Sequence, residues 1–375
     1  MSTTTTAGLR DVIAASSAIC LVNGAEGKLS YFGYDIRELA AHSTFEEVIY
    51  LLWHGELPTT TQLAEHRLAL AAERELPPQI LALLTTFPSS AAPMAVLRTA
   101  VSALAMYDAD AADMSRPANV RKAIHLTARI PTIVAAFDRL RNGRQPIAPR
   151  SGMSLAEDFL FMLSGIEPAP EDARAIDVAL ILHADHELNA STFAAREVAS
   201  TLADMYGAIT AAIATLAGPS HGGANEAVMR MLEAIGSPEQ ADAWVRDALL
   251  RHVRIMGFGH AVYKAEDPRA TVLRLLARQV GERAGDLRWY EISERVERTV
   301  HQDKGLYPNV DFYSASAYHA LGIPTDLFTP VFACSRIAGW TAHVLEQYEN
   351  NRLMRPRADY VGPARRFYAA IEARV

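Results

Sequence analysis

Apolar residues recur along most of the chain with the spacing of amphipathic helices. Within residues 225–236, Val228, Met231, Leu232 and Ile235 fall at i, i+3, i+4 and i+7, which places them on one face of a helix. Alternating apolar and polar residues, the pattern that predicts strands, are almost absent. The chain is therefore predicted to be mainly α-helical.

Four helix starts are marked by capping residues. Two of them match the capping box, in which a hydroxyl accepts an early backbone N–H and a glutamate reaches back to the cap. The other two place a capping side chain before a proline, whose missing N–H costs nothing at the first helical position. The four starts are Ser43-Thr-Phe-Glu46, Ser154-Leu-Ala-Glu157, Ser237-Pro-Glu-Gln240 and Asp267-Pro268.

The exception to the helical pattern lies near the N-terminus, in AICLVNGAEGKLSYFGYD, residues 18–35. Two short β-prone runs flank a turn from Asn23-Gly24 to Gly27. This arrangement predicts a small N-terminal β-hairpin.

Length and hydropathy indicate two helical units with sizeable cores. A chain of 375 residues exceeds the usual size of a single-core domain, so we expect a large domain and a smaller one. Residues 205–220 carry no charge, and residues 327–345 carry only Arg336. The first run is short for a bilayer span and the second contains a proline, a glycine and the arginine, so both are predicted to be buried core helices.

Charge and cysteine content narrow the class of protein. The net charge of −7, from 36 basic and 43 acidic side chains, does not favour a nucleic-acid or membrane-surface binder, which usually carries a basic excess. Cys20 and Cys334 are far apart and in no metal-like spacing, which predicts reduced thiols in a cytoplasmic protein. The first residues, MSTTTTAGLRDVIAASS, lack the pattern of a secretory signal.

Four arginines in three segments of the chain are of interest. Arg336 lies on an otherwise uncharged run, and because a guanidinium stays protonated it needs either a buried acid or an anionic ligand. Arg269 follows Asp267-Pro268 in a first helical turn, where anions are favoured, although by itself it is expected at the surface. Arg355 and Arg357 lie in a basic segment near the C-terminus that reads as a solvated loop.

Two histidines and one aspartate are candidates for acid–base chemistry. His221 lies between a Gly-Pro helix stop and a helix start, where a positive helix end would lower its pKa and keep it neutral. His260 is flanked by glycines that let the backbone approach a ligand. Asp311 stands among aromatic and small residues, where desolvation would raise its proton affinity, although a turn or cap role is the commoner one.

Other familiar signals are incomplete. GFGHAV lacks the third glycine of a dinucleotide-binding loop, and no P-loop occurs. His183 and His186, three residues apart, could share a metal ion, but no HExxH motif accompanies them. A metal-dependent hydrolase built on His183, His186 and Asp311 stays open as an alternative from another class.

Taken together, the segments of the chain resemble the citrate synthase family, including its 2-methylcitrate synthase branch. The resemblance covers most of the chain, and the ordered set of motifs is specific where any one alone is not. The segments are LSYFGYDIRELAAHSTFEEVIYLLWHGELP, ILHADHELNASTFAARE, GPSHGGANEAVMRML, MGFGHAVYKAEDPRA, YPNVDFYSA and FACSRIAGWTAHVLEQ followed by NRLMRPRADYVG.

The resemblance implies a fold and an activity. The fold would be nearly all α, with residues 1–223 and 317–375 in a large domain and residues 224–316 in a small domain inserted in it. The activity would be condensation of acetyl-CoA with oxaloacetate and hydrolysis to citrate and coenzyme A, with propanoyl-CoA as the alternative donor. Acetyl-CoA would be a co-substrate, with no further cofactor or metal. The protein would be a homodimer with shared active sites.

The resemblance also assigns residues to roles. Asp311 would take a proton from the acyl methyl group, His221 would stabilise the enolate, and His260 would protonate the oxaloacetate carbonyl. Asp185 and Glu187, on either side of His186, would act as supports. The oxaloacetate carboxylates would be bound by His186, Arg269, Arg336 and, from the partner subunit, Arg355. Coenzyme A would be bound by Ile255, Gly257 and Gly259, with Lys264, Lys304 and Asn309 as weaker candidates.

One residue departs from the pattern of many bacterial members of the family. Ala261 follows the histidine of the GHxVYK segment where those proteins have arginine, which puts one coenzyme A or acyl contact in doubt. A non-catalytic relative that binds coenzyme A as a regulator is a further alternative. The presence of all three catalytic positions argues against it.

Overall fold

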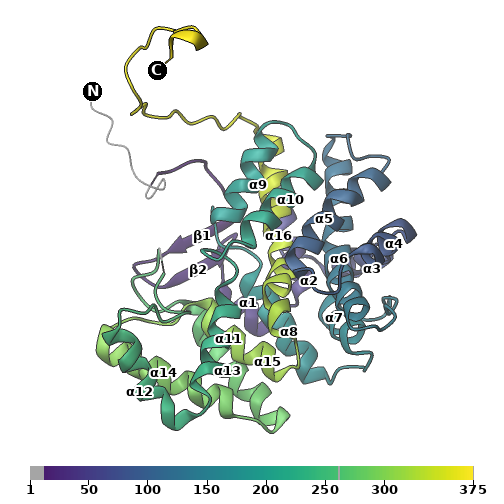
Figure 1. The fold of residues 1–375 in the computed structure, drawn as a ribbon. Helices are drawn as coiled ribbons and strands as arrows, with labels where there is room; N and C mark the ends of the chain where they lie inside the picture. Colours follow the sequence, from purple (N-terminus) through teal and green to yellow (C-terminus); the bar gives the residue numbers. More distant parts are fainter. Residues whose placement is uncertain (1–11, 261, 375) are drawn as a thin grey trace.

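The computed structural model describes residues 12–260 and 262–374, and within them it contains sixteen α-helices and one small sheet (Figure 1). The prediction of a mainly α-helical fold is confirmed. The elements are β1 (Cys20–Asn23), β2 (Lys28–Tyr31), β3 (Tyr34–Asp35), α1 (Ile36–His42), α2 (Phe45–His54), α3 (Thr60–Ala72), α4 (Pro78–Thr86), α5 (Pro93–Leu104), α6 (Arg116–Arg141), α7 (Leu155–Ser164), α8 (Pro170–His183), α9 (Ala190–Ser200), α10 (Met205–Leu216), α11 (Ala224–Ile235), α12 (Pro238–Leu250), α13 (Pro268–Ala284), α14 (Arg288–Lys304), α15 (Val310–Ala320) and α16 (Phe328–Glu349).

The sheet contains the predicted hairpin. β1 and β2 pair antiparallel with Cys20 opposite Tyr31 and Asn23 opposite Lys28, so the turn lies where the Asn-Gly signal placed it. A two-residue third strand, β3, adds to β2. Tyr31 is fully buried, and its hydroxyl donates to the backbone carbonyl of Asp185 at 3.0 Å. The hairpin thereby packs against the segment that follows α8.

Three of the four predicted helix starts are confirmed at the predicted residue. Ser154 forms a complete capping box with Glu157, and α12 and α13 begin at the prolines after Ser237 and Asp267. The start at Ser43 is wrong by one residue, because Thr44 is the cap and Glu47 completes the box. The Ser43 hydroxyl instead donates to the Leu39 carbonyl at the end of α1.

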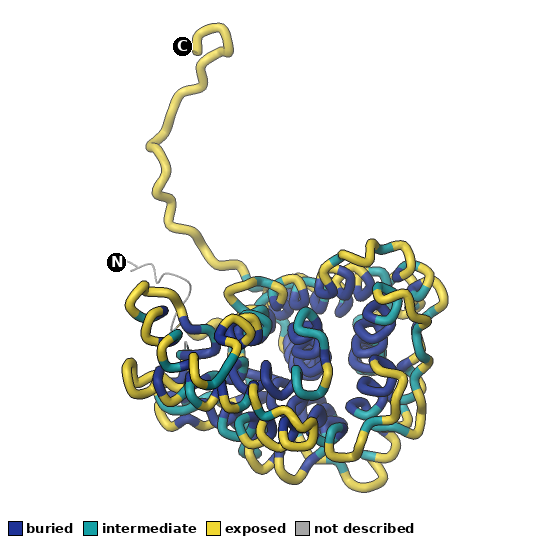
Figure 2. The backbone as a smooth tube through the Cα atoms, turned by 60° about the horizontal axis from the view of Figure 1, so that its bottom comes forward, coloured by how far each residue is buried: buried dark blue, intermediate teal, exposed yellow. Residues whose placement is uncertain are grey.

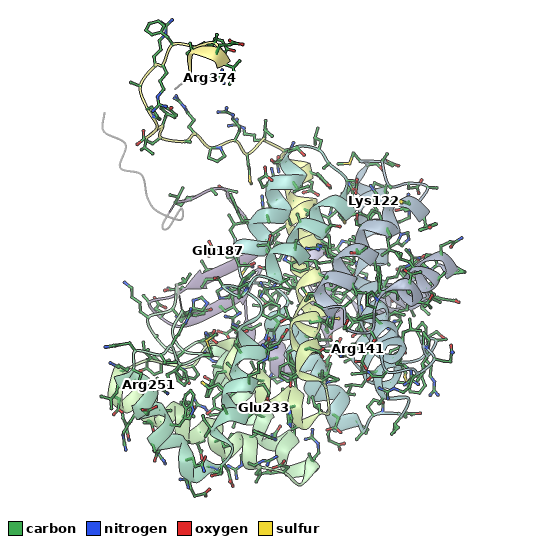
Figure 3. All side chains as sticks on the ribbon, in the orientation of Figure 1. Lys122, Arg141, Glu187, Glu233, Arg251 and Arg374 are labelled. Carbon is green, nitrogen blue, oxygen red and sulfur yellow. The ribbon has the colours of Figure 1, made fainter. Side chains whose placement is uncertain are left out.

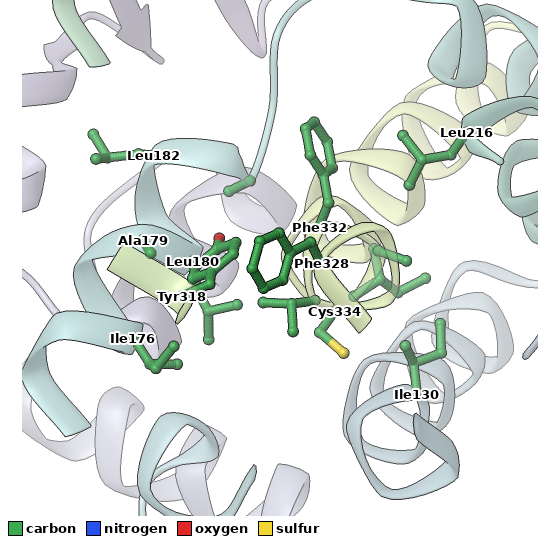
Figure 4. Packing of buried hydrophobic residues seen from close by; sticks show 14 of the residues in the cluster. Ile130, Ile176, Ala179, Leu180, Leu182, Leu216, Tyr318, Phe328, Phe332 and Cys334 are labelled. Carbon is green, nitrogen blue, oxygen red and sulfur yellow. The ribbon is translucent and has the colours of Figure 1, made fainter. Parts of the chain in front are cut away.

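The central helix of the core is α16 (Phe328–Glu349), the last α-helix of the described chain. Nineteen of its 22 residues are buried, as expected of a helix that is apolar on every side. Figure 4 shows Phe328, Phe332 and Cys334 of α16 between α8 and α6. The helix also contacts α2, α9 and α10. Because α16 is enclosed in this way, Arg336 in its middle is also enclosed.

Helices α11 to α15 form a separate group at the lower left of the molecule in Figure 1. Within it α13 packs on α15 and α12 packs on α14. The face predicted for residues 225–236 is confirmed, because Val228, Met231, Leu232 and Ile235 of α11 are all buried. This group corresponds to the range expected for the small domain, residues 224–316, except that α15 continues to Ala320. The exact division into two domains stays a prediction.

The chain after α16 leaves the body of the molecule. Figure 2 shows it as a long exposed segment, and Figure 3 shows Arg374 far from the packed helices. It ends in a short 3₁₀ turn at Ile371–Ala373. Its large apolar side chains are exposed, including Phe367 at 87%. These exposed side chains are therefore not packed against the described helices of this chain, whereas the base of the tail, at residues 351–354, is bonded to α9 and α16.

The sequence predicted two reduced thiols and apolar helices that are buried rather than membrane-spanning. Cys20 and Cys334 are both free and buried. Over the residues that the structure describes, no helix combines the length and the hydropathy needed to span a bilayer.

Candidate active site

The segment that follows α8 packs directly on α16. Ala184, Asp185 and His186 are each at most 7% exposed. The Gly339 N–H of α16 donates to the Ala184 carbonyl at 3.1 Å, and a Cβ at Gly339 would come within 2.4 Å of both that oxygen and Asp185 Oδ1. Only glycine allows this close approach. The segment is thereby fixed to the core helix, and the cluster of acids and histidines lies inside the molecule.

His186 lies against His260 and Tyr263 from the loop before α13. Its Nε2 is 3.2 Å from the Tyr263 hydroxyl, and its ring is 5.1 Å from the His260 ring, centroid to centroid. Burial lowers the pKa of His186 well below its usual value, and the nearby Arg269 lowers it further. The imidazole is therefore neutral at physiological pH.

The tautomer of His260 follows from its backbone contacts. The N–H groups of Val262 and Tyr263 donate to His260 Nδ1 at 3.0 and 3.2 Å. Because Nδ1 accepts, the ring proton lies on Nε2. Burial lowers the pKa of His260 to about 4, with a further contribution from Arg269. His260 is thus a neutral hydrogen-bond donor through Nε2.

His221 has the opposite tautomer. It lies in the turn between α10 and α11, and its Nε2 is 3.3 Å from the Ser191 backbone N–H and 2.8 Å from the Ser191 hydroxyl. Since a backbone N–H can only donate, Nε2 accepts and the proton lies on Nδ1. Burial and Arg336 lower the pKa of His221 to about 4. The predicted neutral state is confirmed, although its main cause is burial.

Arg269 is buried, so the expectation that it lies at the surface is wrong. It is 2% exposed and bonds Asp267 through two nitrogens, Nε to Oδ1 at 3.0 Å and Nη2 to Oδ2 at 2.7 Å. Asp267 also caps α13 by accepting the Arg269 backbone N–H. The cap therefore fixes the direction of the guanidinium, whose charge acts on the pKa values of His186, His260 and Asp311.

Arg336 is buried without an acidic partner. It is 2% exposed, its Nε donates to the His183 carbonyl at 2.7 Å, and its guanidinium lies over the Phe332 ring. Within the described residues it forms no ion pair, and burial lowers its pKa to about 10. Of the two explanations that the sequence left open, the anionic ligand fits better than the buried ion pair.

Asp311 is the carboxylate of the site. It lies in the first turn of α15, where Asn309 caps the helix by accepting the Asp311 N–H at 3.0 Å. Its Oδ1 is buried, and within the described residues it has no hydrogen-bond partner. Burial raises the pKa of Asp311 to about 7, against the opposing charges of Arg269 and Arg336. The group is therefore available to accept a proton near neutral pH.

A short bridge joins the loop before α13 to the start of α15. Phe258 pairs with Pro308, the Asn309 N–H donates to the Gly257 carbonyl at 2.9 Å, and the Gly259 N–H donates to the Tyr307 carbonyl at 3.1 Å. Gly257 has φ +80°, and a Cβ there would lie 2.8 Å from both Phe312 and Val228. Three of the residues expected to bind coenzyme A, Gly257, Gly259 and Asn309, thus lie next to Asp311.

The remaining residues predicted to bind coenzyme A or oxaloacetate have, within the described part of the chain, no contact of this kind with the start of α15. Ile255 is buried at the start of this loop, while the Lys264 and Lys304 side chains are exposed. Arg355 lies in the exposed tail, so it does not reach the site of its own chain, and its assignment to the partner's site stays a prediction. Ala261 lies outside the described residues.

The metal-dependent alternative finds no support in the positions of these side chains. His183 Nδ1 bonds the Ala179 carbonyl at 2.7 Å, and its ring packs on Phe332 inside the core. Burial lowers the pKa of His183 to about 3. Across residues 12–260 and 262–374, no three His, Cys, Asp or Glu side chains are grouped so that they could hold a metal ion.

Comparison with known proteins decides the family. The family model described as "Citrate synthase, C-terminal domain" matches residues 8–357. "Citrate synthase 2" of Bacillus subtilis (strain 168) is 50% identical over 372 residues, which cover 99% of this chain and 100% of the relative. The chain belongs to the citrate synthase family. Among its other relatives is "2-methylcitrate synthase 2" of Corynebacterium glutamicum, 43% identical over 98% of this chain and 97% of the relative.

Solved structures of citrate synthases share the fold. The ternary complex of carboxymethyl coenzyme A and oxaloacetate with the citrate synthase of Thermoplasma acidophilum superimposes with a TM-score of 0.93 at 34% identity, covering 98% of each chain. The resemblance derived from the motifs is thereby confirmed for both family and fold. The roles of individual residues rest on the geometry above.

Sequence reasoning missed several residues that support this citrate synthase site. Asp185 was expected only as a support, but its partner His343, 3.3 Å from Nε2 to Oδ1, was not identified. Tyr263 and Ser191, which contact His186 and His221, were also missed. A local signal existed only for Asp267, since an acid two residues before an arginine can bond it. The other contacts join segments far apart in sequence.

Proposed function

We propose that the protein is a citrate synthase, an acyltransferase that condenses acetyl-CoA with oxaloacetate and hydrolyses citryl-CoA to citrate and coenzyme A. The observation that carries the proposal is Asp311, a carboxylate with a buried, unbonded oxygen and a pKa near 7. It shares a site with neutral imidazoles and two buried guanidinium groups. Acid–base chemistry on a carbon acid beside a dianion requires this combination.

The first step is removal of a proton from the methyl group of the thioester. This methyl group is a very weak carbon acid, so the base must be partly desolvated and a donor must be in place for the developing enolate oxygen. Asp311 Oδ1 is the base. The Nδ1–H of His221 is the donor, because its Nε2 is already engaged by Ser191. The negative charge that develops on the enolate oxygen is thus stabilised by a hydrogen-bond donor that is already in place.

The second step joins the enolate carbon to the ketone carbon of oxaloacetate. The ketone oxygen gains negative charge as the bond forms, and the Nε2–H of His260 donates to it. Because backbone N–H groups occupy Nδ1, the ring cannot turn its proton away from the substrate without losing both bonds. Water then attacks the thioester carbon, which releases coenzyme A and leaves citrate.

Oxaloacetate is a dianion, and fixed guanidinium groups suit its two carboxylates. Arg336 offers a charge without an acidic partner, and Arg269 offers the edge that Asp267 leaves free. His186 contributes a neutral contact beside them. We assign the partner subunit's Arg355 to the same substrate, which makes the functional unit a homodimer.

Coenzyme A is assigned to the loop that carries Ile255, Gly257 and Gly259, with Asn309 at its edge and Lys264 and Lys304 as outer contacts. The proximity of this loop to Asp311 supports the assignment, since the acyl group must reach the base. We assign residues 224–316 to the small domain and the rest to the large one. Closure between them would exclude water during carbon–carbon bond formation. The chemistry calls for no cofactor, and a cytoplasmic location stays a prediction.

A thiol-release assay tests the proposal. Free coenzyme A should appear only when acetyl-CoA and oxaloacetate are both present, in amounts matched by citrate. Release without oxaloacetate, or no release with both substrates, would contradict it.

The second candidate is 2-methylcitrate synthase, favoured by the similarity to relatives of that name. The two activities differ by one methylene of the acyl group, which is worth only about 1–3 kcal/mol in a binding pocket. Comparison of kcat/KM for acetyl-CoA and propanoyl-CoA separates them, and a higher value for propanoyl-CoA would reverse the order of the two candidates.

A further inference from the structure

Arg196 of α9 lies at a point where the active-site segment and the C-terminal tail come together. It is 3% exposed and points its guanidinium at three side chains of α16: His343, Glu346 and Gln347. We call these four residues the Arg196 cluster. Arg196, Glu346 and Gln347 of the cluster line a cavity of about 940 Å³, and residues 353–356 of the tail are also among its lining residues. None of the catalytic or substrate roles above uses it.

One series of hydrogen bonds from Arg196, which we call the active-site branch, leads to the active site. Arg196 Nη1 donates to His343 Nδ1 at 3.0 Å, and because a guanidinium can only donate, the His343 proton lies on Nε2. That nitrogen donates to Asp185 Oδ2 at 3.4 Å and lies 3.3 Å from Oδ1. Asp185 Oδ2 in turn accepts the Glu187 N–H at 3.0 Å.

The turn held by this branch is strained. Glu187 has φ +52°, a conformation that residues other than glycine seldom adopt and that persists only where the surroundings enforce it. The bond to Asp185 is such a constraint, and His186 lies between the two residues. Arg196 thus fixes the segment that presents His186, through two intervening side chains.

The other branch leads to the tail. Arg196 Nε donates to Gln347 Oε1 at 3.1 Å, and Gln347 Nε2 donates to Asn351 Oδ1 at 3.0 Å and to the Arg352 carbonyl at 3.3 Å. Ser200, one helical turn from Arg196 on α9, accepts the Met354 N–H at 3.0 Å. The residue that follows Met354 is Arg355. The same side chain therefore holds the base of the segment that carries Arg355.

We propose that Arg196 is a positioning residue that fixes the His186 segment of its own active site and the base of the Arg355 tail at the same time. The proposal rests on the proposed function for its consequence: one side chain then adjusts contacts to oxaloacetate in two active sites, its own through His186 and the partner's through Arg355. The other substrate, acetyl-CoA, is assigned to a different loop, so its binding should not depend on Arg196.

Three variants separate the branches. Arg196→Met removes both branches with little change in volume, His343→Phe removes the active-site branch, and Gln347→Met removes the tail branch. His343→Gln keeps an acceptor for Arg196 and a donor for Asp185, so it should restore what His343→Phe loses. Arg298→Met, at an arginine of α14 whose side chain is 54% exposed, is the control for loss of a charge.

Amide hydrogen exchange measures, without any substrate, how well the His186 segment and the base of the tail are held in place. In Arg196→Met, exchange should become about 10-fold faster both at residues 185–189 and at residues 351–355, because the bonds that protect Glu187 and Met354 lose their support. His343→Phe should affect only the first segment and Gln347→Met only the second. Unchanged exchange in both segments of Arg196→Met would overturn the proposal.

Steady-state kinetics measures the expected effect on oxaloacetate binding. The KM for oxaloacetate should rise about 10-fold or more in Arg196→Met, because small displacements of substrate-binding groups are costly, while the KM for acetyl-CoA stays within about 2-fold. Equal rises in both KM values would show a purely structural role and overturn it. If the unaltered protein shows no turnover, the proposed function fails, whereas the exchange measurements still decide the role of Arg196.

Discussion

Asp267 and Arg269 form a two-point ion pair in which neither residue is more than 2% exposed. Removal of one partner from a buried pair leaves the other charge uncompensated. Asp267→Asn should therefore lower the free energy of unfolding by about 3 kcal/mol, measured by denaturant titration. Asp172→Asn, which breaks the half-exposed pair with Arg283, should cost less than about 1 kcal/mol, and equal losses would contradict this explanation.

Arg336 should behave in the opposite way. Its burial is compensated by no acid among the described residues, so Arg336→Met should leave stability unchanged or improved. Oxaloacetate affinity should fall by about 10- to 100-fold, the worth of a charge-assisted hydrogen bond. Calorimetric titration with oxaloacetate measures the affinity. Retained affinity together with lost stability would make Arg336 a structural residue.

Asp311→Asn should remove the base and little volume. General-base catalysis is worth about 10²- to 10⁴-fold, so kcat should fall within that range while the circular dichroism spectrum is unchanged. Asp303→Asn, on the exposed face of α14, is the matched control and should keep full activity. Activity above about one tenth in Asp311→Asn would assign the base elsewhere.

The pH dependence of kcat/KM follows from the same carboxylate. Asp311 must be ionised to accept a proton, and burial raises its pKa to about 7, so kcat/KM should fall as the pH drops below about 7. His221 and His260 have pKa values near 4 and stay neutral through this range. Asp177 also has a pKa raised by burial, to about 6, but it lies on α8, where its side chain accepts the Phe45 N–H at the start of α2. Asp177→Asn should therefore keep the acid limb, and loss of that limb would refute the assignment to Asp311.

Ionisation of Asp311 should also affect stability. Its folded pKa is above its unfolded value, so the folded state binds the proton more tightly. The resulting stabilisation is complete at pH values below the unfolded pKa and is lost as the pH rises to about 7. Asp311→Asn should flatten this part of the curve of unfolding free energy against pH.

Two glycines of the loop before α13 should respond differently to a methyl group. A Cβ at Gly257 would lie 2.8 Å from Phe312, the neighbour of Asp311, so Gly257→Ala should cost about 2–3 kcal/mol and reduce kcat. Gly259 has a similar positive φ but open space around it, so Gly259→Ala should cost only about 1 kcal/mol of backbone strain. Thermal denaturation of both variants measures the difference.

Local patterns in the sequence were sufficient to predict the mainly helical fold, the hairpin and most of the helix starts that capping residues mark. Periodicity predicted the buried face of α11, and Ser154 with Glu157 predicted the start of α7. The shifted start of α2 shows the limit, since two overlapping boxes fit the sequence equally well. The Glu46 side chain accepts the Leu155 N–H of α7 at 2.7 Å. Glu47 therefore completes the capping box with Thr44.

The motifs also identified the family and predicted the residues of the site, but not the state of those residues. That Arg336 has no acidic partner among the described residues, that His221 carries its proton on Nδ1, and that Asp311 has a pKa near 7 all depend on contacts between distant segments. The His260 tautomer, in contrast, follows from the N–H groups of Val262 and Tyr263 close by in sequence. Burial and neighbouring charge are properties of the packed chain, and they decide protonation. The sequence therefore determined which groups are present and roughly where, and tertiary packing alone decided what chemistry they can perform.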